Sequence, residues 1–145
     1  MKISTKVQHA LRMMLDFAEH RNEGFISLKE VAARLDVSKT YLEQVMIQIN
    51  KTDFLITARG AQGGYKLARP TSKYTVGDIF RAVDGDIALA ASAEQGSGDG
   101  DLRISRMAVD VWAGLERVML DYLDNLTLQD IQDKHMSYLG YDFSI

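Results

Sequence analysis

The chain has 145 residues, of which 46% are hydrophobic, and it contains no cysteine. This length suits one ordinary domain, or a small domain with an added oligomerisation element, and the hydrophobic content is enough for a buried core. No apolar run approaches the roughly 18 residues of a membrane span, and the first residues lack a secretory core, so we expect a cytoplasmic protein without a membrane partner. Without cysteine there is no disulfide, no thiolate nucleophile and no cysteine-ligated zinc or iron–sulfur site.

The net charge of −3 is divided unevenly along the chain. Residues 1–75 hold twelve Lys and Arg against seven Asp and Glu, a net charge of +5, which leaves −8 for the remainder. A basic half suits a polyanionic partner, although scattered surface charge gives the same totals.

Helical periodicity opens the chain. Apolar residues recur at i, i+4, i+7 and i+11 from Val7 to Ala18, which predicts a helix over residues 5–20. The run Ser27-Leu28-Lys29-Glu30 has the pattern of a capping box, so a second, short helix is predicted to start there and to end near Leu35.

A third helix and a hairpin follow. Ser38 caps a helix predicted over residues 39–51, whose apolar face comprises Leu42, Val45, Met46 and Ile49. The β-rich run 54–58, the glycine-rich turn 59–64 and a second short run, 65–67, predict a β-hairpin.

The rest of the chain is predicted to form a linker and helices. Pro70 closes the hairpin unit, and Thr75-Val76-Gly77-Asp78 caps another helix. Residues 88–103 are rich in Ala, Ser and Gly without periodicity and predict a flexible loop. A long helix is predicted over 105–125, followed by a short helix capped by Thr127 and an aromatic tail.

The order of these elements is that of a winged helix-turn-helix. We therefore predict a mainly α fold, a winged helix-turn-helix with a small β-hairpin wing plus a long C-terminal dimerisation helix. The predicted divisions are a winged helix-turn-helix DNA-binding domain (1–85), a flexible loop (86–104), a dimerisation helix (105–126), and a C-terminal helix and tail (127–145).

The solvent side of the third helix carries side chains suited to base edges. Gln can bond adenine, Glu can accept from the cytosine amino group, and Lys can hold phosphate or guanine. The predicted major-groove residues are Ser38, Lys39, Thr40, Tyr41, Glu43, Gln44 and Gln48. An ordinary solvated helix face is the alternative.

The hairpin tip is predicted to lie along the DNA backbone. Its glycines permit positive φ and close approach to another molecule, and Arg59 fits a narrow minor groove. The predicted contacts of the wing and with phosphates are Arg59, Gly60, Gln62, Gly63, Gly64, Tyr65, Lys66, Lys2 and Lys6. A simple surface hairpin is the alternative, whereas a phosphate-binding P-loop is excluded because no Lys-Ser/Thr pair follows the glycines.

The long helix carries two adjoining apolar stripes, more than one small domain needs to cover. The predicted homodimer interface consists of Val111, Trp112, Leu115, Val118, Met119 and Tyr122. The alternative is a helix buried within its own chain. A dimer would space two third helices about one DNA turn, roughly 34 Å, to read a pseudo-palindrome.

Enzymatic chemistry finds no support in the sequence. No acid–base pair, nucleophile–base pair or cofactor loop can be assembled from the motifs, and the histidines are scattered. We therefore predict a protein that is not an enzyme and that has no catalytic residue, metal site or cofactor.

Several motifs together resemble the Rrf2 family of bacterial transcription regulators, which includes iron–sulfur-cluster, nitric-oxide-sensing and cysteine-metabolism regulators. They are Ile3-Ser4-Thr5-Lys6, Ser27-Leu28-Lys29-Glu30-Val31-Ala32, Tyr41-Leu42-Glu43-Gln44, Arg59-Gly60-x-x-Gly63-Gly64-Tyr65, Val76-Gly77-Asp78-Ile79 and Ala82-Val83-Asp84-Gly85. The resemblance implies a dimer of winged helices with crossing long helices, with residues 38–48 in the major groove and residues 59–65 near the minor groove.

The resemblance also bears on the signal. Cluster-binding members carry three cysteines in the loop that matches about residues 88–105, where the likeliest equivalents here are Ser92, Gly98 and Ile104. Without thiolates such a cluster has no ligands, so the chain is nearest in type to the cysteine-metabolism repressors.

The expected function is therefore that of a sequence-specific regulator, a repressor that binds double-stranded DNA at a pseudo-palindromic operator as a homodimer, with a partner enzyme or a small-molecule effector. The alternative is a regulatory protein-interaction module that acts mainly through a partner enzyme, such as one of cysteine synthesis, rather than through DNA.

Overall fold

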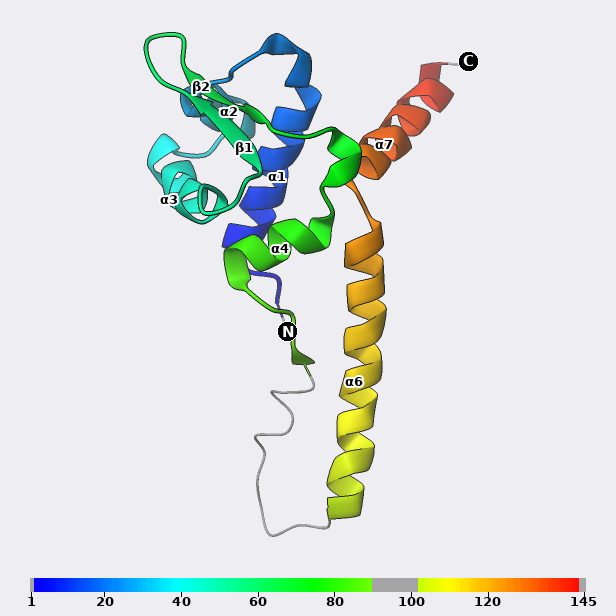
Figure 1. The fold of residues 1–145 in the computed structure, drawn as a ribbon. Coiled ribbons are helices and arrows are strands. Elements are labelled where there is room, and N and C mark those ends of the chain that lie inside the picture. The colour runs from blue at the N-terminus through cyan, green and yellow to red at the C-terminus, as the bar shows by residue number, and fades with distance from the viewer. Residues whose placement is uncertain (1, 90–101, 144–145) are drawn as a thin grey trace.

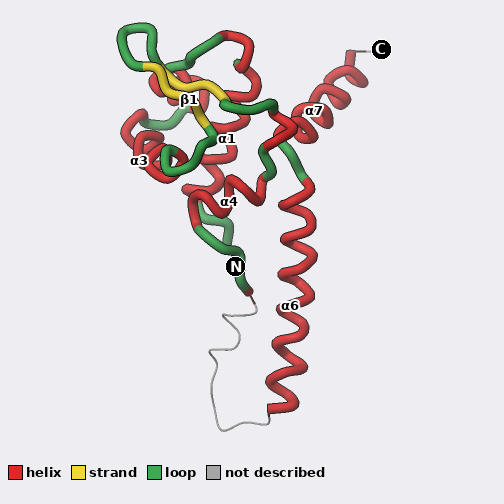
Figure 2. The backbone as a smooth tube through the Cα atoms, viewed as in Figure 1, coloured by secondary structure: helices red, strands yellow, loops and turns green. Residues whose placement is uncertain are grey.

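The computed structural model describes the backbone of residues 2–89 and 102–143, with side chains described through residue 136. A small helical body with a β-hairpin at one edge carries a long helix that extends away from it (Figure 1). Apart from the hairpin strands, the regular elements are helical (Figure 2). In chain order they are α1 (Thr5–Glu19), a 3-10 turn (Arg21–Glu23), α2 (Leu28–Leu35), α3 (Lys39–Ile49), β1 (Leu55–Ala58), β2 (Gly64–Leu67), a 3-10 turn (Thr71–Lys73), α4 (Val76–Asp84), α6 (Leu102–Asn125) and α7 (Leu128–Phe143).

The core lies where the first four helices meet. Its largest fully buried side chains are Phe17, Met13, Met14, Leu42, Met46, Ile49, Tyr74, Ile79 and Leu128. The apolar face predicted for the third helix is the face that α3 buries. Between α2 and α3 the chain turns at Asp36, whose φ of 55° lies in the left-handed region and whose amide caps the end of α2. This tight turn produces the helix-turn-helix.

One predicted cap forms only in part. The Ser27 hydroxyl accepts a hydrogen bond from the Glu30 amide at 3.2 Å, but the Glu30 carboxylate lies 3.9 Å from the Arg34 guanidinium, its i+4 neighbour, and no described bond returns it to Ser27. The prediction of a complete capping box is wrong here because the ion pair competes for the carboxylate. The equivalent box at α4 is complete, with Thr75 and Asp78 exchanging bonds of 3.1 and 3.0 Å.

The hairpin is tied to the body by a third short stretch of backbone. Strands β1 and β2 pair antiparallel with Leu55 opposite Leu67, and Ile26 pairs with Tyr65 on the other edge of β2 through N–H···O bonds of 2.9 and 2.8 Å. A Cβ on Gly64 would lie 2.3 Å from the Ile26 carbonyl oxygen. Glycine is therefore required at residue 64 for the hairpin to dock beside the start of α2.

The C-terminal elements are longer than predicted. Helix α6 begins at Leu102 rather than at residue 105, and α7 continues for 16 residues, so its backbone includes the segment predicted as a tail. Of the loop predicted over 86–104, residues 90–101 lie outside the described residues. None of the helices in the described part is long and apolar enough to cross a membrane.

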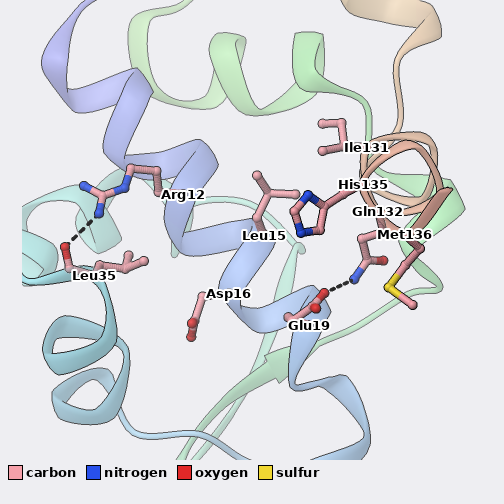
Figure 3. Close-up of a pocket in the computed structure, with 9 residues that line it drawn as sticks. All are labelled: Arg12, Leu15, Asp16, Glu19, Leu35, Ile131, Gln132, His135 and Met136. Carbon is pink, nitrogen blue, oxygen red and sulfur yellow. Dashed lines mark hydrogen bonds between the residues drawn. The ribbon is translucent and has the colours of Figure 1, made fainter. Parts of the chain in front are cut away.

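Helix α7 packs beside α1 and leaves a cavity of about 410 Å³ between them (Figure 3). At one end the Arg12 guanidinium donates to the Leu35 carbonyl oxygen at 2.7 Å, and at the other the Gln132 amide donates to the Glu19 carboxylate at 3.0 Å. The first bond ties α1 to α2, and the second ties it to α7.

Candidate nucleic-acid interface

The exposed face of α3 gathers most of the side chains predicted to read DNA. Ser38, Lys39, Thr40, Glu43 and Gln44 are exposed. The Ser38 hydroxyl accepts from the Tyr41 amide at 3.0 Å, so this side chain serves as the helix cap. At the N-terminal end of the helix, the unpaired amides and the helix dipole favour a phosphate group.

Two side chains of this face of α3 form an ion pair with each other. The Lys39 ammonium lies 3.6 Å from the Glu43 carboxylate, and both groups are exposed. Such an i,i+4 pair stabilises a helix by about 0.3–0.5 kcal/mol, so either partner can be released to a base or a phosphate at little cost.

The remaining two predicted major-groove residues are half-buried. The Tyr41 ring packs against the core and meets the His9 ring edge-on at 5.0 Å between centroids. Gln48 is also half-buried. Tyr41 therefore packs α3 against α1, and its contact with DNA stays a prediction.

The wing tip presents Arg59, Gly60 and Gln62 to solvent. Gly60 has a φ of 107°, which only glycine adopts without strain, and a Cβ there would meet nothing within 4 Å. Within the described part of the chain, no hydrogen bond or ion pair restrains the Arg59 side chain. An arginine in this position can enter a minor groove without first breaking a bond.

Other predicted wing residues are engaged inside the chain. A Cβ on Gly63 would lie 2.3 Å from the Ala58 carbonyl oxygen, the Tyr65 ring packs edge-on against Phe17, and the Lys66 ammonium lies 4.6 Å from the centre of the Phe25 ring. The glycine pair provides room for the protein's own backbone, and its contact with DNA stays a prediction. Near the N-terminus, Lys2 is exposed and Lys6 half-buried.

Sequence reasoning missed one exposed residue of α3. Ile47 is 57% exposed, the one large apolar side chain exposed on this helix. The signal was available, because Ile47 lies outside the spacing of the buried residues Leu42, Val45, Met46 and Ile49.

Helix α6 buries none of its 24 residues. Val111, Trp112, Leu115, Val118 and Tyr122 are exposed, with Val118 at 66%, whereas Met119 and Leu123 are half-buried. Of the two apolar stripes, the molecule's own body partly covers one and leaves the other in solvent. An apolar stripe of this length that the chain itself leaves uncovered marks an interaction surface.

An ion pair fixes the angle at which α6 leaves the body. The Arg81 guanidinium donates to both carboxylate oxygens of Asp124 at 2.8 Å, and this hydrogen-bonded partner lowers the pKa of Asp124 and raises that of Arg81. A Cβ on Gly77 would lie 2.1 Å from the Asp124 carboxylate. Arg81, Asp124 and Gly77 thus form one joint between α4 and α6.

The helix-turn-helix, the wing and the exposed polar face of α3 define a DNA-binding transcription regulator of the winged-helix class. The family model described as "Rrf2: Iron-dependent Transcriptional regulator" matches residues 3–134. The chain therefore belongs to the Rrf2 family, as the motifs predicted.

Relatives of this chain bear regulator names. It is 33% identical over 139 residues to the HTH-type transcriptional regulator IscR of Cereibacter sphaeroides, which covers 94% of this chain and 90% of the relative. The IscR of Pectobacterium carotovorum is 30% identical over 132 residues, or 90% of this chain and 79% of the relative.

Solved structures show the same fold. The IscR of T. potens superposes with a TM-score of 0.73 at 34% identity, covering 93% of this chain and 88% of that one. CymR of B. subtilis, described as a global cysteine regulator, also has a TM-score of 0.73, at 28% identity, covering 92% of this chain and 98% of that one.

The family description names iron, and the residues at hand do not fit an iron site. The sequence has no cysteine, and in the described ranges no three His, Cys, Asp or Glu side chains lie together as a metal ion requires. Ser92 and Gly98 of the predicted sensor loop lie outside the described residues, and Ile104 is exposed in the first turn of α6.

Proposed function

We propose that this regulator is a homodimeric repressor that places α3 in the major groove and the wing tip near the minor groove of a pseudo-palindromic operator. The observation that carries the proposal is the exposed polar face of α3 beside the unrestrained Arg59 at the wing tip. In this proposal the polar face of α3 reads base edges, and the wing tip contacts the DNA backbone.

The dimer rests on the uncovered stripe of α6. An apolar stripe on one helix can be covered by the same stripe of a second copy about a two-fold axis, which gives a closed, self-complementary interface. Such a dimer would present two copies of α3 to DNA, and half-sites about one helical turn apart would match it. No thiolate is available to a cluster, so no step of the function uses one.

Selection of duplexes from a random pool tests the reading of DNA. We expect a pseudo-palindrome whose binding weakens steeply with salt, because each phosphate neutralised contributes a slope of about −0.9 in log K against log salt concentration. Gln44→Ala should weaken binding to the selected site, whereas Lys134→Ala, an exposed cation on α7, is the matched control and should not. Equal binding to selected and random duplexes would contradict the proposal.

Repression and dimerisation need separate measurements. A reporter placed behind the selected operator should be silenced by the unaltered protein and expressed with Arg59→Ala. Val118→Glu should convert the dimer into a monomer by light scattering, while Asp121→Asn, an exposed change on the same helix, should leave it dimeric. A dimer that binds an enzyme equally well with Gln44→Ala and Arg59→Ala, and that binds no DNA, would instead favour the protein-interaction module.

A further inference from the structure

Ile47 lies in the middle of the face of α3 that points away from the core. At 3.6 residues per turn it follows Glu43 by four residues and Gln44 by three, so it lies one turn beyond them on the same surface. The four buried residues of α3 lie on the other side of the helix. The fold therefore has no need of an isoleucine at residue 47.

The surroundings of Ile47 make it unusual. Every other exposed residue of α3 is polar or charged, and most of the other large apolar side chains exposed in the described ranges belong to α6. An aliphatic side chain has no donor or acceptor for a base edge. Among the groups in the major groove, only the C5-methyl of thymine offers it apolar contact.

We propose that Ile47 is a specificity-determining residue that packs on a thymine methyl group in each half-site, an inference that rests on the proposed function of α3. Helical rise places it about 4.5 Å beyond Gln44 along the axis, close to one base-pair step. The thymine is therefore expected within two base pairs of the base that Gln44 contacts.

Removal of the methyl group alone gives the sharpest test. In the selected operator each thymine is replaced in turn by deoxyuridine, which lacks the C5-methyl and pairs identically with adenine. With the unaltered protein, one thymine in each half-site should respond to this replacement. Replacing it in one half-site should weaken binding about fourfold, and replacing it in both half-sites about fifteenfold, which are the losses expected for one and two buried methyl groups.

Variants assign the effect to the side chain. Ile47→Ala should bind the thymine and deoxyuridine duplexes equally, and Ile47→Val should retain part of the difference. Gln44→Ala is the matched control, because it should weaken both duplexes alike and keep their ratio. Since Ile47 is exposed, its variants should have the same urea unfolding midpoint as the unaltered protein, so the comparison of duplexes does not depend on folding.

Each outcome has a distinct meaning. A DNA-binding dimer that binds thymine and deoxyuridine operators equally overturns the methyl contact and leaves the proposed function intact. The same holds for a ratio that Ile47→Ala does not change, or for a selected site without thymine near the Gln44 contact. A protein with no preferred duplex at all overturns the proposed function and this contact with it.

Discussion

Arg81 and Asp124 join the DNA-binding body to the long helix through two parallel hydrogen bonds of 2.8 Å. The two residues are 43 positions apart in sequence, so the pair fixes the relation between α4 and α6 and not the geometry of one helix. In a dimer built on α6, the angle at this joint would set the distance between the two copies of α3. In the proposed dimer, the pair would therefore matter more for the spacing of half-sites than for stability.

Asp124→Asn measures how much the ion pair contributes to the free energy of unfolding. Its partner holds the pKa of Asp124 below the ordinary value, so the pair stabilises the fold above about pH 4 and this contribution is lost as pH falls through the lowered pKa. Both side chains are about a third or more exposed, so screening limits the loss to less than about 1 kcal/mol. Urea unfolding at pH 7 should show this difference, and at pH 3 the difference should shrink. An undiminished difference at pH 3 would contradict it.

The effect of Gly77→Ala on stability should change sign when Asp124 is removed. A Cβ there meets the Asp124 carboxylate at 2.1 Å, so the substitution should break the ion pair and destabilise the protein. In an Asp124→Ala background only the flexible Arg81 guanidinium remains close, at 3.1 Å, and alanine in a helix should then stabilise by about 0.5–1 kcal/mol over glycine. A double-mutant cycle by thermal unfolding measures this coupling, and additive effects would contradict it.

Tyr74→Phe should destabilise the base of the hairpin by about 1–3 kcal/mol, because it leaves the Arg69 amide without its acceptor and removes one of the two donors to the Phe54 carbonyl oxygen, the other being the Ala68 amide. The Tyr74 hydroxyl donates to the Phe54 carbonyl at 2.6 Å and accepts from the Arg69 amide at 3.0 Å, and the residue is fully buried. The exposed Tyr122 gives the matched control, Tyr122→Phe, with no comparable loss.

Alkaline pH should act on the same hydroxyl. Burial is the main cause of the raised pKa of Tyr74, so the fold keeps its stability below the ordinary value near 10 and loses it as pH rises toward the raised one. Unfolding measured between pH 8 and 11 should show that loss, and Tyr74→Phe should flatten it. A variant with the same alkaline slope would assign the slope to other groups.

Gly64→Ala should separate the wing from the body. The added Cβ would lie 2.3 Å from a backbone oxygen, which cannot move aside as a side chain can. We expect a loss of about 1–3 kcal/mol in unfolding free energy and weaker DNA binding than that loss explains. Gly114→Ala is the control, since a Cβ there meets nothing within 4 Å. Unchanged exchange protection of the Tyr65 amide would contradict this account.

Local patterns predict the winged-helix order well, because apolar periodicity and a capping residue indicate each helix of the body. Ser27, Ser38 and Thr75 all cap the helices predicted from them. The start of α6 is harder to predict, because Asp101 and Ser105 are both of the residue types that cap helices, and the apolar spacing becomes regular only from Ala108. The length of α7 also differs from the prediction, because Gly140 and the aromatic residues around it indicate a tail in the sequence, whereas the backbone stays helical to Phe143.

Contacts between distant segments were beyond the sequence. Nothing local shows that Gly77 leaves space for Asp124, or that Gly64 lies against Ile26. The sequence therefore predicts only contacts of the wing glycines with a ligand, whereas the structure shows that Gly63 and Gly64 also serve the protein's own packing. The apolar stripes of α6 were visible, and only the structure shows which one remains uncovered.

The bond pair between Ile26 and Tyr65 has a kinetic consequence. It holds the wing and the helix-turn-helix as one preformed surface, so little of the chain beyond the tip at residues 59–63 is left to order when DNA arrives. Association with DNA should then be limited by electrostatic encounter and not by a slow folding step. The association rate constant should fall as ionic strength rises, and the observed rate should stay proportional to protein concentration.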